Sequence, residues 1–120
     1  MASLRDQLKA RHGGLSPLIT GREKISTAEV TGADRLTLGH IHLIVSNDGA
    51  PFAVVVFKEF PNNFYFSGAI LTDIISDIYA LLNTEVGEVL DVSDEKIVLR
   101  ASTEISKNRR PYTNWTFIDD

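Results

Sequence analysis

The residues most able to do chemistry form few of the patterns that catalysis requires. The chain has no cysteine, which excludes a thiol nucleophile and a thiolate-bound metal. It also lacks the two common phosphate-binding sequences, Gly-x-x-x-x-Gly-Lys-Ser/Thr and Gly-x-Gly-x-x-Gly. His40 and His42 stand two apart on one side of a predicted strand, as metal ligands can, but no further ligand motif supports them. We interpret both as residues of a solvated strand face, and we expect no enzymatic activity, no metal and no cofactor.

Aromatic residues suggest recognition instead. Six of the ten aromatic side chains fall between Phe52 and Phe66. Aromatic rings can stack on nucleic-acid bases, and each stacked base contributes roughly 1–3 kcal/mol. The hairpin that carries these rings either packs into the hydrophobic core or forms a surface on which a planar ligand can stack. The sequence alone leaves both interpretations open.

The charged residues are unevenly distributed on a chain with a net charge of −4. From Asp73 to Glu95 there are seven acidic residues and no Lys or Arg, which we interpret as a solvating face. Two basic clusters remain, one near each end of the sequence: Arg5, Lys9, Arg11, Arg22 and Lys24, and then Lys107, Arg109 and Arg110. A local basic strip of this kind can hold a phosphate backbone weakly and with a strong dependence on salt.

The elements that position these residues follow from hydrophobic periodicity. Period-two patterns predict strands over 36–45, 52–60, 64–67, 95–105 and 112–118, and a 3.6-residue pattern predicts a helix over 69–82. Gly39 inside the first strand predicts a bulge or a sharp bend. Residues 85–92 are either a short extra strand or a loop.

The order strand, strand, strand, helix, strand, strand is typical of a mainly β protein with one core helix. It favours a five-stranded, OB-like Greek-key barrel, and an open α+β sheet with one covering helix is the alternative. We place the barrel domain at 26–120 and an N-terminal helix and flexible arm at 1–25. Ser3 would cap a helix over about 3–11. Residues 15–24 are either a loosely packed terminus or a basic arm that covers a ligand or pairs with another subunit.

Strand alternation assigns side chains to faces. If Val55 and Phe57 face inward, then Phe52, Val54, Val56, Lys58 and Phe60 face outward. In the hairpin formed by the predicted strands 95–105 and 112–118, Lys96, Arg100 and Tyr112 then face outward. Trp115 and Phe117 point to the core, unless the indole N–H of Trp115 finds a hydrogen-bond partner outside it. The predicted nucleic-acid-binding residues are Lys58, Phe60, Tyr65, Lys96, Arg100, Lys107, Arg109, Arg110, Tyr112 and Trp115.

One segment carries a family resemblance. Ser106-Lys-Asn-Arg-Arg-Pro-Tyr-Thr-Asn-Trp resembles the Ser-Lys-x-Gly-Arg-x-Tyr turn and strand that closes several OB-fold single-stranded-DNA-binding proteins of phages and prophages. Residues 52–59 and 64–75 are similar to such proteins too, and the resemblance covers about 36–119. Within the turn motif it departs at Arg109, where glycine is usual. The resemblance extends to the basic turn Lys107, Arg109 and Arg110, and to Tyr112 and Trp115.

The resemblance implies sequence-tolerant binding of single-stranded DNA in phage replication or recombination. It also implies a homodimer or higher oligomer, with phage or host replication proteins as further partners. No apolar run is long enough to span a bilayer and the N-terminus does not read as a signal peptide, so we expect no membrane partner and a cytoplasmic location, in the host cell if the protein is phage-encoded. The alternative function is a protein–protein interaction module, a phage adaptor or a host-factor inhibitor, acting through the acidic region 73–95.

Overall fold

The structure, a computed structural model, describes residues 16–118. Within this range the elements follow in the order β1 (Glu23–Lys24), α2 (Thr27–Thr31), β2 (Leu36–Val45), β3 (Pro51–Phe57), β4 (Asn63–Phe66), α3 (Ala69–Leu81), β5 (Val89–Asp91), β6 (Val98–Ile105) and β7 (Pro111–Phe117). The predicted helix at 3–11 lies outside the described residues. Across 16–118, neither helix is both long and apolar enough to cross a membrane.

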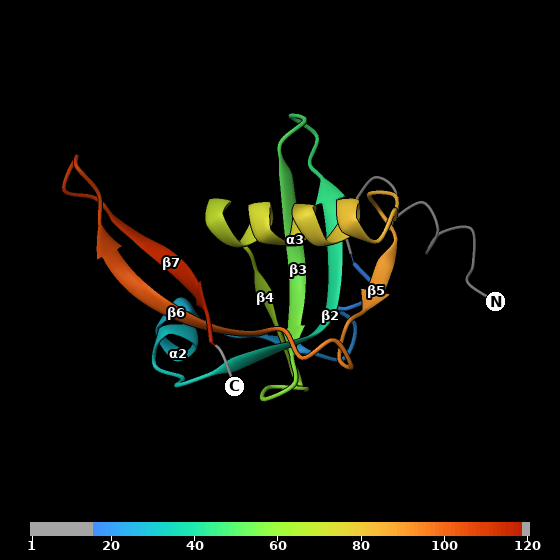
Figure 1. Cartoon of the computed structure of the whole chain (residues 1–120), viewed down its shortest axis with the longest axis horizontal. Helices are drawn as coiled ribbons and strands as arrows, with labels where there is room; N and C mark the ends of the chain where they lie inside the picture. Colours follow the sequence, from blue (N-terminus) through green and yellow to red (C-terminus); the bar gives the residue numbers. More distant parts are fainter. Residues whose placement is uncertain (1–15, 119–120) are drawn as a thin grey trace.

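A curled sheet in the shape of half a barrel forms the frame (Figure 1). Its strands lie in the order β1-β4-β3-β2-β6-β7, and β5 pairs with β2. The chain is therefore mainly β and barrel-like, as the sequence predicts. Within the described part of the chain, β1 pairs only with Asn63 and Phe64 of β4, and neither β1 nor β4 pairs with β7. The sheet therefore stays open along the seam between the end of β4 and β7.

The sheet changes direction in β2. The register between β2 and β3 shifts between Leu38 and His40, which confirms the predicted irregularity at Gly39. A Cβ atom on Gly39 would lie only 2.9 Å from the carbonyl oxygen of Val56. Only glycine allows this close approach of two backbones, and the resulting bulge bends the strand. β2 can therefore pair with β3 along most of its length and with β6 at its start.

The main core lies between α3 and the concave side of the sheet (Figure 1). Leu71, Ile75 and Tyr79 recur every four residues on α3, which places them on one helix face, and all three are buried. They belong to the same hydrophobic cluster as Phe57 and Trp115 from the strands. The predicted helix 69–82 is confirmed within one residue of its end.

Residues 16–19 cover the opposite face of the sheet. β1 adds to β4 in parallel, and Leu18 packs with Val54, Val56 and Phe64 in a second buried cluster. The sequence predicts correctly that Val54 and Val56 point away from the main core. They are nevertheless buried, because Leu18 and Ile19 pack over them, which local alternation cannot reveal. This face of β3 is therefore closed to a ligand.

Candidate nucleic-acid interface

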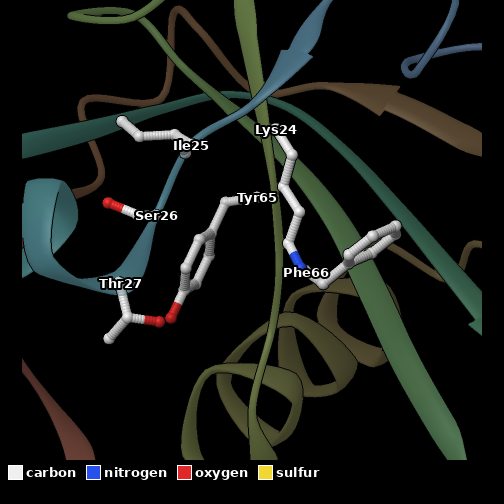
Figure 2. Close-up of a pocket in the computed structure, with 6 residues that line it drawn as sticks. All are labelled: Lys24, Ile25, Ser26, Thr27, Tyr65 and Phe66. Carbon is white, nitrogen blue, oxygen red and sulfur yellow. The ribbon is translucent and has the colours of Figure 1, made fainter.

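The open seam between β4 and β7 forms a groove. The groove has a volume of about 570 Å³ and continues into a second hollow of about 410 Å³ beside β1, which Figure 2 shows. The two hollows share Thr27, Tyr65 and Phe66, so they form one continuous surface. Its walls are the edge of β4, the first turn of α3 and the edge of β7. In a closed barrel these two edges would be joined by backbone hydrogen bonds.

β4 presents one aromatic ring to each side of the sheet, because successive side chains of a strand alternate. Tyr65 points inward and is 5% exposed, whereas Phe66 points outward and is 37% exposed. Phe52 and Phe64 contact the Phe66 ring edge-on, with centroid distances of 6.3 and 5.3 Å. The Lys24 Nζ atom lies 5.3 Å from the Phe66 centroid, a cation–π contact (Figure 2). Phe66 is thus a positioned ring with a cation beside it.

The start of α3 forms the floor of the groove. Gly68 occupies the N-cap position, and no side chain caps the helix. The neighbouring Ser67 hydroxyl accepts the Ala53 N–H at 2.8 Å and pairs with the Thr72 hydroxyl, so it is not available as a cap. The first backbone N–H groups of a helix attract anions, since they lack intrahelical acceptors and lie at the positive end of the helix dipole. The groove therefore combines apolar rings with an electropositive floor.

The β6–β7 hairpin extends beyond the body of the protein and carries the other cations (Figure 1). Its turn is closed by hydrogen bonds from Ser106 N to Arg110 O and from Arg109 N to Ser106 O, both 2.9 Å. Arg109 has φ 60, the left-handed region that glycine adopts most easily. The arginine therefore keeps a backbone conformation that glycine would favour. Lys107, Arg109 and Arg110 are all exposed at this tip.

Tyr112 connects the hairpin tip to the groove. It follows Arg110 by two residues, is 42% exposed and lines the groove together with Thr113. The structure therefore brings one predicted site residue of the hairpin, Tyr112, to one end of the groove, whereas Lys107, Arg109 and Arg110 lie beyond it in the hairpin turn. Phe66 and Lys24 lie toward the other end.

Two predicted stacking residues are in the core instead. Tyr65 and Trp115 are each 5% exposed, and their ring centroids lie 5.9 Å apart. The Trp115 ring also stacks on Phe57, with a centroid distance of 5.9 Å and an interplanar angle of 19°. The prediction that these two rings offer open faces to bases is wrong, because the three aromatic residues fill the interior between β3, β4 and β7. Only the edge of Tyr65 reaches the groove (Figure 2).

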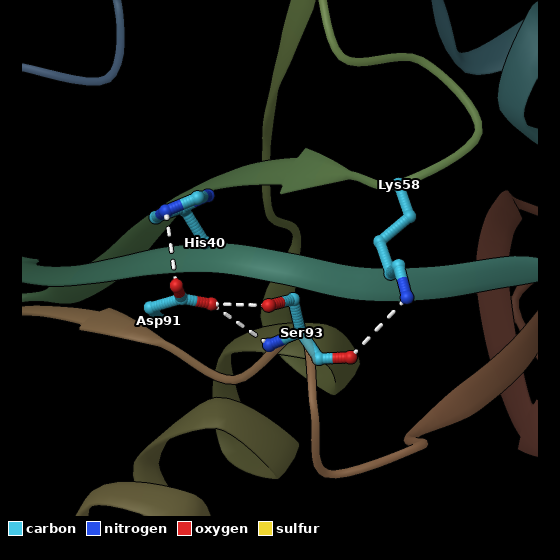
Figure 3. Close-up of polar contacts among 4 residues, drawn as sticks. All are labelled: His40, Lys58, Asp91 and Ser93. Carbon is cyan, nitrogen blue, oxygen red and sulfur yellow. Dashed lines mark hydrogen bonds and ion pairs between the residues drawn. The ribbon is translucent and has the colours of Figure 1, made fainter.

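The other four predicted residues lie elsewhere. Lys58 is exposed and its ammonium donates to the Ser93 carbonyl at 3.4 Å (Figure 3). Phe60 is half-buried against the main core, so it offers little free ring. Lys96 and Arg100 are exposed, before β6 and within it. None of the four lines the groove. Lys58 and Phe60 lie beyond the end of β3 at Phe57, whereas Tyr65 pairs with Val55 within that strand.

The sequence reasoning did not select Phe66 or Lys24 as site residues. A signal for Phe66 was present in the alternation of β4, since an inward Tyr65 requires an outward Phe66. No comparable signal existed for Lys24, whose position depends on the parallel pairing of β1 with β4.

His40 and His42 do not share an environment. His42 is buried: its Nε2 atom lies 2.8 Å from the Gly87 carbonyl and its Nδ1 atom 2.7 Å from the Ser16 hydroxyl. A carbonyl only accepts, so the bond to Gly87 requires a proton on Nε2; in a neutral ring Nδ1 then accepts from the Ser16 hydroxyl. The interpretation of both histidines as solvated is therefore wrong for His42. Between residues 16 and 118, no three His, Asp or Glu side chains group as ligands of one metal ion.

His40 belongs to a small polar cluster on the surface (Figure 3). Its Nε2 atom lies 3.7 Å from the Asp91 carboxylate. Hydrogen bonds from the Ser93 hydroxyl and N–H lower the pKa of Asp91, and the nearby His40 and Lys58 lower it further. Each residue of this cluster has a local partner, so we assign it no chemistry.

Comparison of the chain with protein-family models, with curated proteins and with solved structures finds no match. The function must therefore be inferred from the site itself.

Proposed function

We propose that this protein binds single-stranded DNA without sequence preference, along the groove between β4 and β7 and the β6–β7 hairpin. The observation that carries the proposal is the open seam itself. It presents two partly exposed rings, Phe66 and Tyr112, with Lys24 near one end. At the other end, Tyr112 follows the exposed cations of the hairpin tip by two residues. Flat rings between cations match the alternation of bases and phosphates in an unpaired strand.

We further propose that the fold is an opened OB-like barrel. Three observations support this: β2, β3 and β4 form a meander, α3 follows, and β6 and β7 return as a hairpin whose first strand pairs with β2. In OB folds the loop between the fourth and fifth strands takes part in oligonucleotide binding. The β6–β7 turn occupies the equivalent place in this order of strands.

The expected affinity follows from the two rings and the cations. Two stacked bases contribute about 2–6 kcal/mol together. Micromolar binding corresponds to about 8 kcal/mol, so the rings alone fall short and the phosphate contacts must supply the difference. Binding should therefore weaken steeply as salt is raised.

The test is a fluorescence anisotropy titration of labelled oligo-dT at several salt concentrations. An external label is needed because Trp115 is buried and stacked on Phe57, so its own emission is a poor reporter. The variant K107A/R109N/R110A should lower the salt slope by about 2, since each phosphate contact to a single strand contributes about 0.7. Asparagine at 109 tolerates the left-handed backbone.

The matched control is K58Q/K96N/R100Q, which removes three exposed cations that lie outside both the groove and the hairpin tip. It should leave the salt slope nearly unchanged. For the rings, Tyr112→Leu should weaken binding by about 1–3 kcal/mol, while Phe117→Leu, at an exposed ring outside the groove, should not. Equal effects of the two triple variants would refute the groove, and the absence of any salt-dependent binding would refute the function.

In this proposal the protein acts without catalysis, in phage replication or recombination, as a dimer or larger assembly and in the cytoplasm. One observation favours the alternative of a protein–protein interaction module. Several large apolar side chains are exposed within the acidic region, among them Leu81 and Val86. A flat oligo-dT titration together with stable binding of a protein at this surface would favour that alternative.

A further inference from the structure

Apolar side chains gather on the surface at the end of α3. We call this surface the helix-end patch. It lies where α3, β5 and the end of β2 meet (Figure 1), and it comprises Leu81 (83% exposed), Leu82 (49%), Val86 (52%) and Val45 (52%). Among residues 16–118 it contains four of the nine large apolar side chains that are exposed. Exposed patches of this kind usually mark an interaction site.

The patch is firmly held. The Tyr79 hydroxyl accepts the Leu43 N–H at 3.0 Å, and the Thr84 N–H donates to the Tyr79 carbonyl at 2.9 Å. The Gly87 N–H donates to the Leu43 carbonyl at 2.8 Å. These bonds tie the segment after α3 to β2, so the apolar side chains stand on a defined surface.

The charge around the patch identifies the kind of partner it fits. Glu85 and Glu88 stand within the patch segment, Asp77 lies one turn back on α3, and no Lys or Arg occurs from Asp73 to Glu95. A partner should therefore combine an apolar stripe with positive charge.

The sequence contains such a segment, and the structure shows where it begins. The hydroxyl of Ser16, the first described residue, is hydrogen-bonded to His42 Nδ1. His42 Nε2 is in turn hydrogen-bonded to the carbonyl of Gly87, the residue after Val86. The chain thus enters the described structure beside the patch. Residues 1–15 carry Leu4 and Leu8 at helical spacing, and a cationic set of Arg5, Lys9 and Arg11.

We propose that residues 3–11 of the same chain dock on the helix-end patch as a short amphipathic helix, with Leu4 and Leu8 against the apolar side chains and the cations toward Glu85 and Glu88. Nine helical residues span about 13 Å, and the four residues 12–15 can bridge about the same distance when extended. A tether this short gives an effective concentration in the millimolar range, so weak contacts suffice. This proposal is independent of the DNA-binding groove.

The test uses the absence of cysteine from the chain. The full-length variant L8C/L82C has two thiols, and mild oxidation of a dilute sample should give an intramolecular disulfide in the monomer, detected by mass spectrometry and non-reducing electrophoresis. The matched control is L8C/T20C. Thr20 is exposed and only four residues from Ser16, so a tethered but undocked segment would reach it readily.

We expect the L8C/L82C disulfide to form at least tenfold faster than the control disulfide, and E85K/E88K in the same background to remove most of that difference. A second pair, L4C/L81C, repeats the measurement if substitution at Leu82 disturbs folding. Equal rates for patch and control pairs would overturn the proposal. Disulfide-linked dimers that increase with protein concentration would also overturn it, and would assign the patch to a second copy.

Discussion

The hydroxyl of Tyr79 allows a direct test of the hydrogen bonds that join the end of α3 to β2. Tyr79 is 2% exposed and reaches from α3 to the edge of β2. Its hydroxyl accepts the Leu43 N–H at 3.0 Å and donates toward the carbonyls of Glu88 and Ile41. Tyr79→Phe keeps the ring, so it creates almost no cavity and removes only these polar contacts.

The expected cost follows from what remains after the hydroxyl is lost. The Leu43 N–H loses its acceptor in a residue that is 2% exposed. A buried donor left without an acceptor costs about 1–3 kcal/mol, and the carbonyls that lose their donor add to this. We therefore expect Tyr79→Phe to lower the free energy of unfolding by about 2–3 kcal/mol.

The matched control is Tyr65→Phe. Tyr65 is also buried in the core, but its hydroxyl forms no hydrogen bond with any residue from 16 to 118. Its loss should change stability by less than about 0.5 kcal/mol. Both variants can be compared by urea unfolding at 25 °C, with the denaturant slope unchanged. A similar loss in the two variants would show that the Tyr79 hydrogen bonds do not anchor the end of α3.

The same residue gives a pH dependence whose sign is defined. Burial raises the pKa of Tyr79 above the ordinary value of about 10. The folded state therefore keeps this proton more tightly than the unfolded state. The contribution of the Tyr79 hydroxyl to the free energy of unfolding is complete below about pH 10. It is lost as the pH rises through the raised pKa. The stability difference between the wild type and Tyr79→Phe should consequently narrow above about pH 10.

Three further predictions concern single backbone positions. Gly39→Ala should destabilise the protein by about 1–3 kcal/mol in urea unfolding, because its Cβ would meet the Val56 carbonyl oxygen; a neutral result would mean that the two strands can move apart. Ser26→Ala removes half of the capping box that Ser26 forms with Glu29 at the start of α2, and should cost about 1 kcal/mol in the same assay unless α2 frays without consequence. Arg109→Gly should relieve the left-handed strain at φ 60 and stabilise the hairpin by about 0.5–1 kcal/mol, while weakening oligo-dT binding; if affinity is retained, Arg109 does not contact phosphate.

Much of the local structure could be predicted from the sequence, because its causes are local. The boundaries of the strand at 36–45 and the start of the helix at Ala69 agree with the structure, since alternation and helical periodicity are properties of neighbouring residues. The irregularity at Gly39 and the basic turn at 106–110 follow equally from residue type. Residues 89–91 form β5, which decides between the two interpretations of that segment in favour of a strand.

The candidate site depended on contacts between distant parts of the chain. Alternation predicts that Val54 and Val56 share one face of β3, but not that Leu18 and Ile19 will bury that face. It likewise separates Tyr65 from Phe66 without deciding which of them meets solvent. The exposure of the two rings depends on tertiary contacts. Phe57 and Trp115 pack against Tyr65 and bury it, whereas Phe66 lies beside Lys24 at the rim of the open seam. A local pattern assigns a side chain to a face of its element, whereas its exposure is set by whatever segment packs against that face.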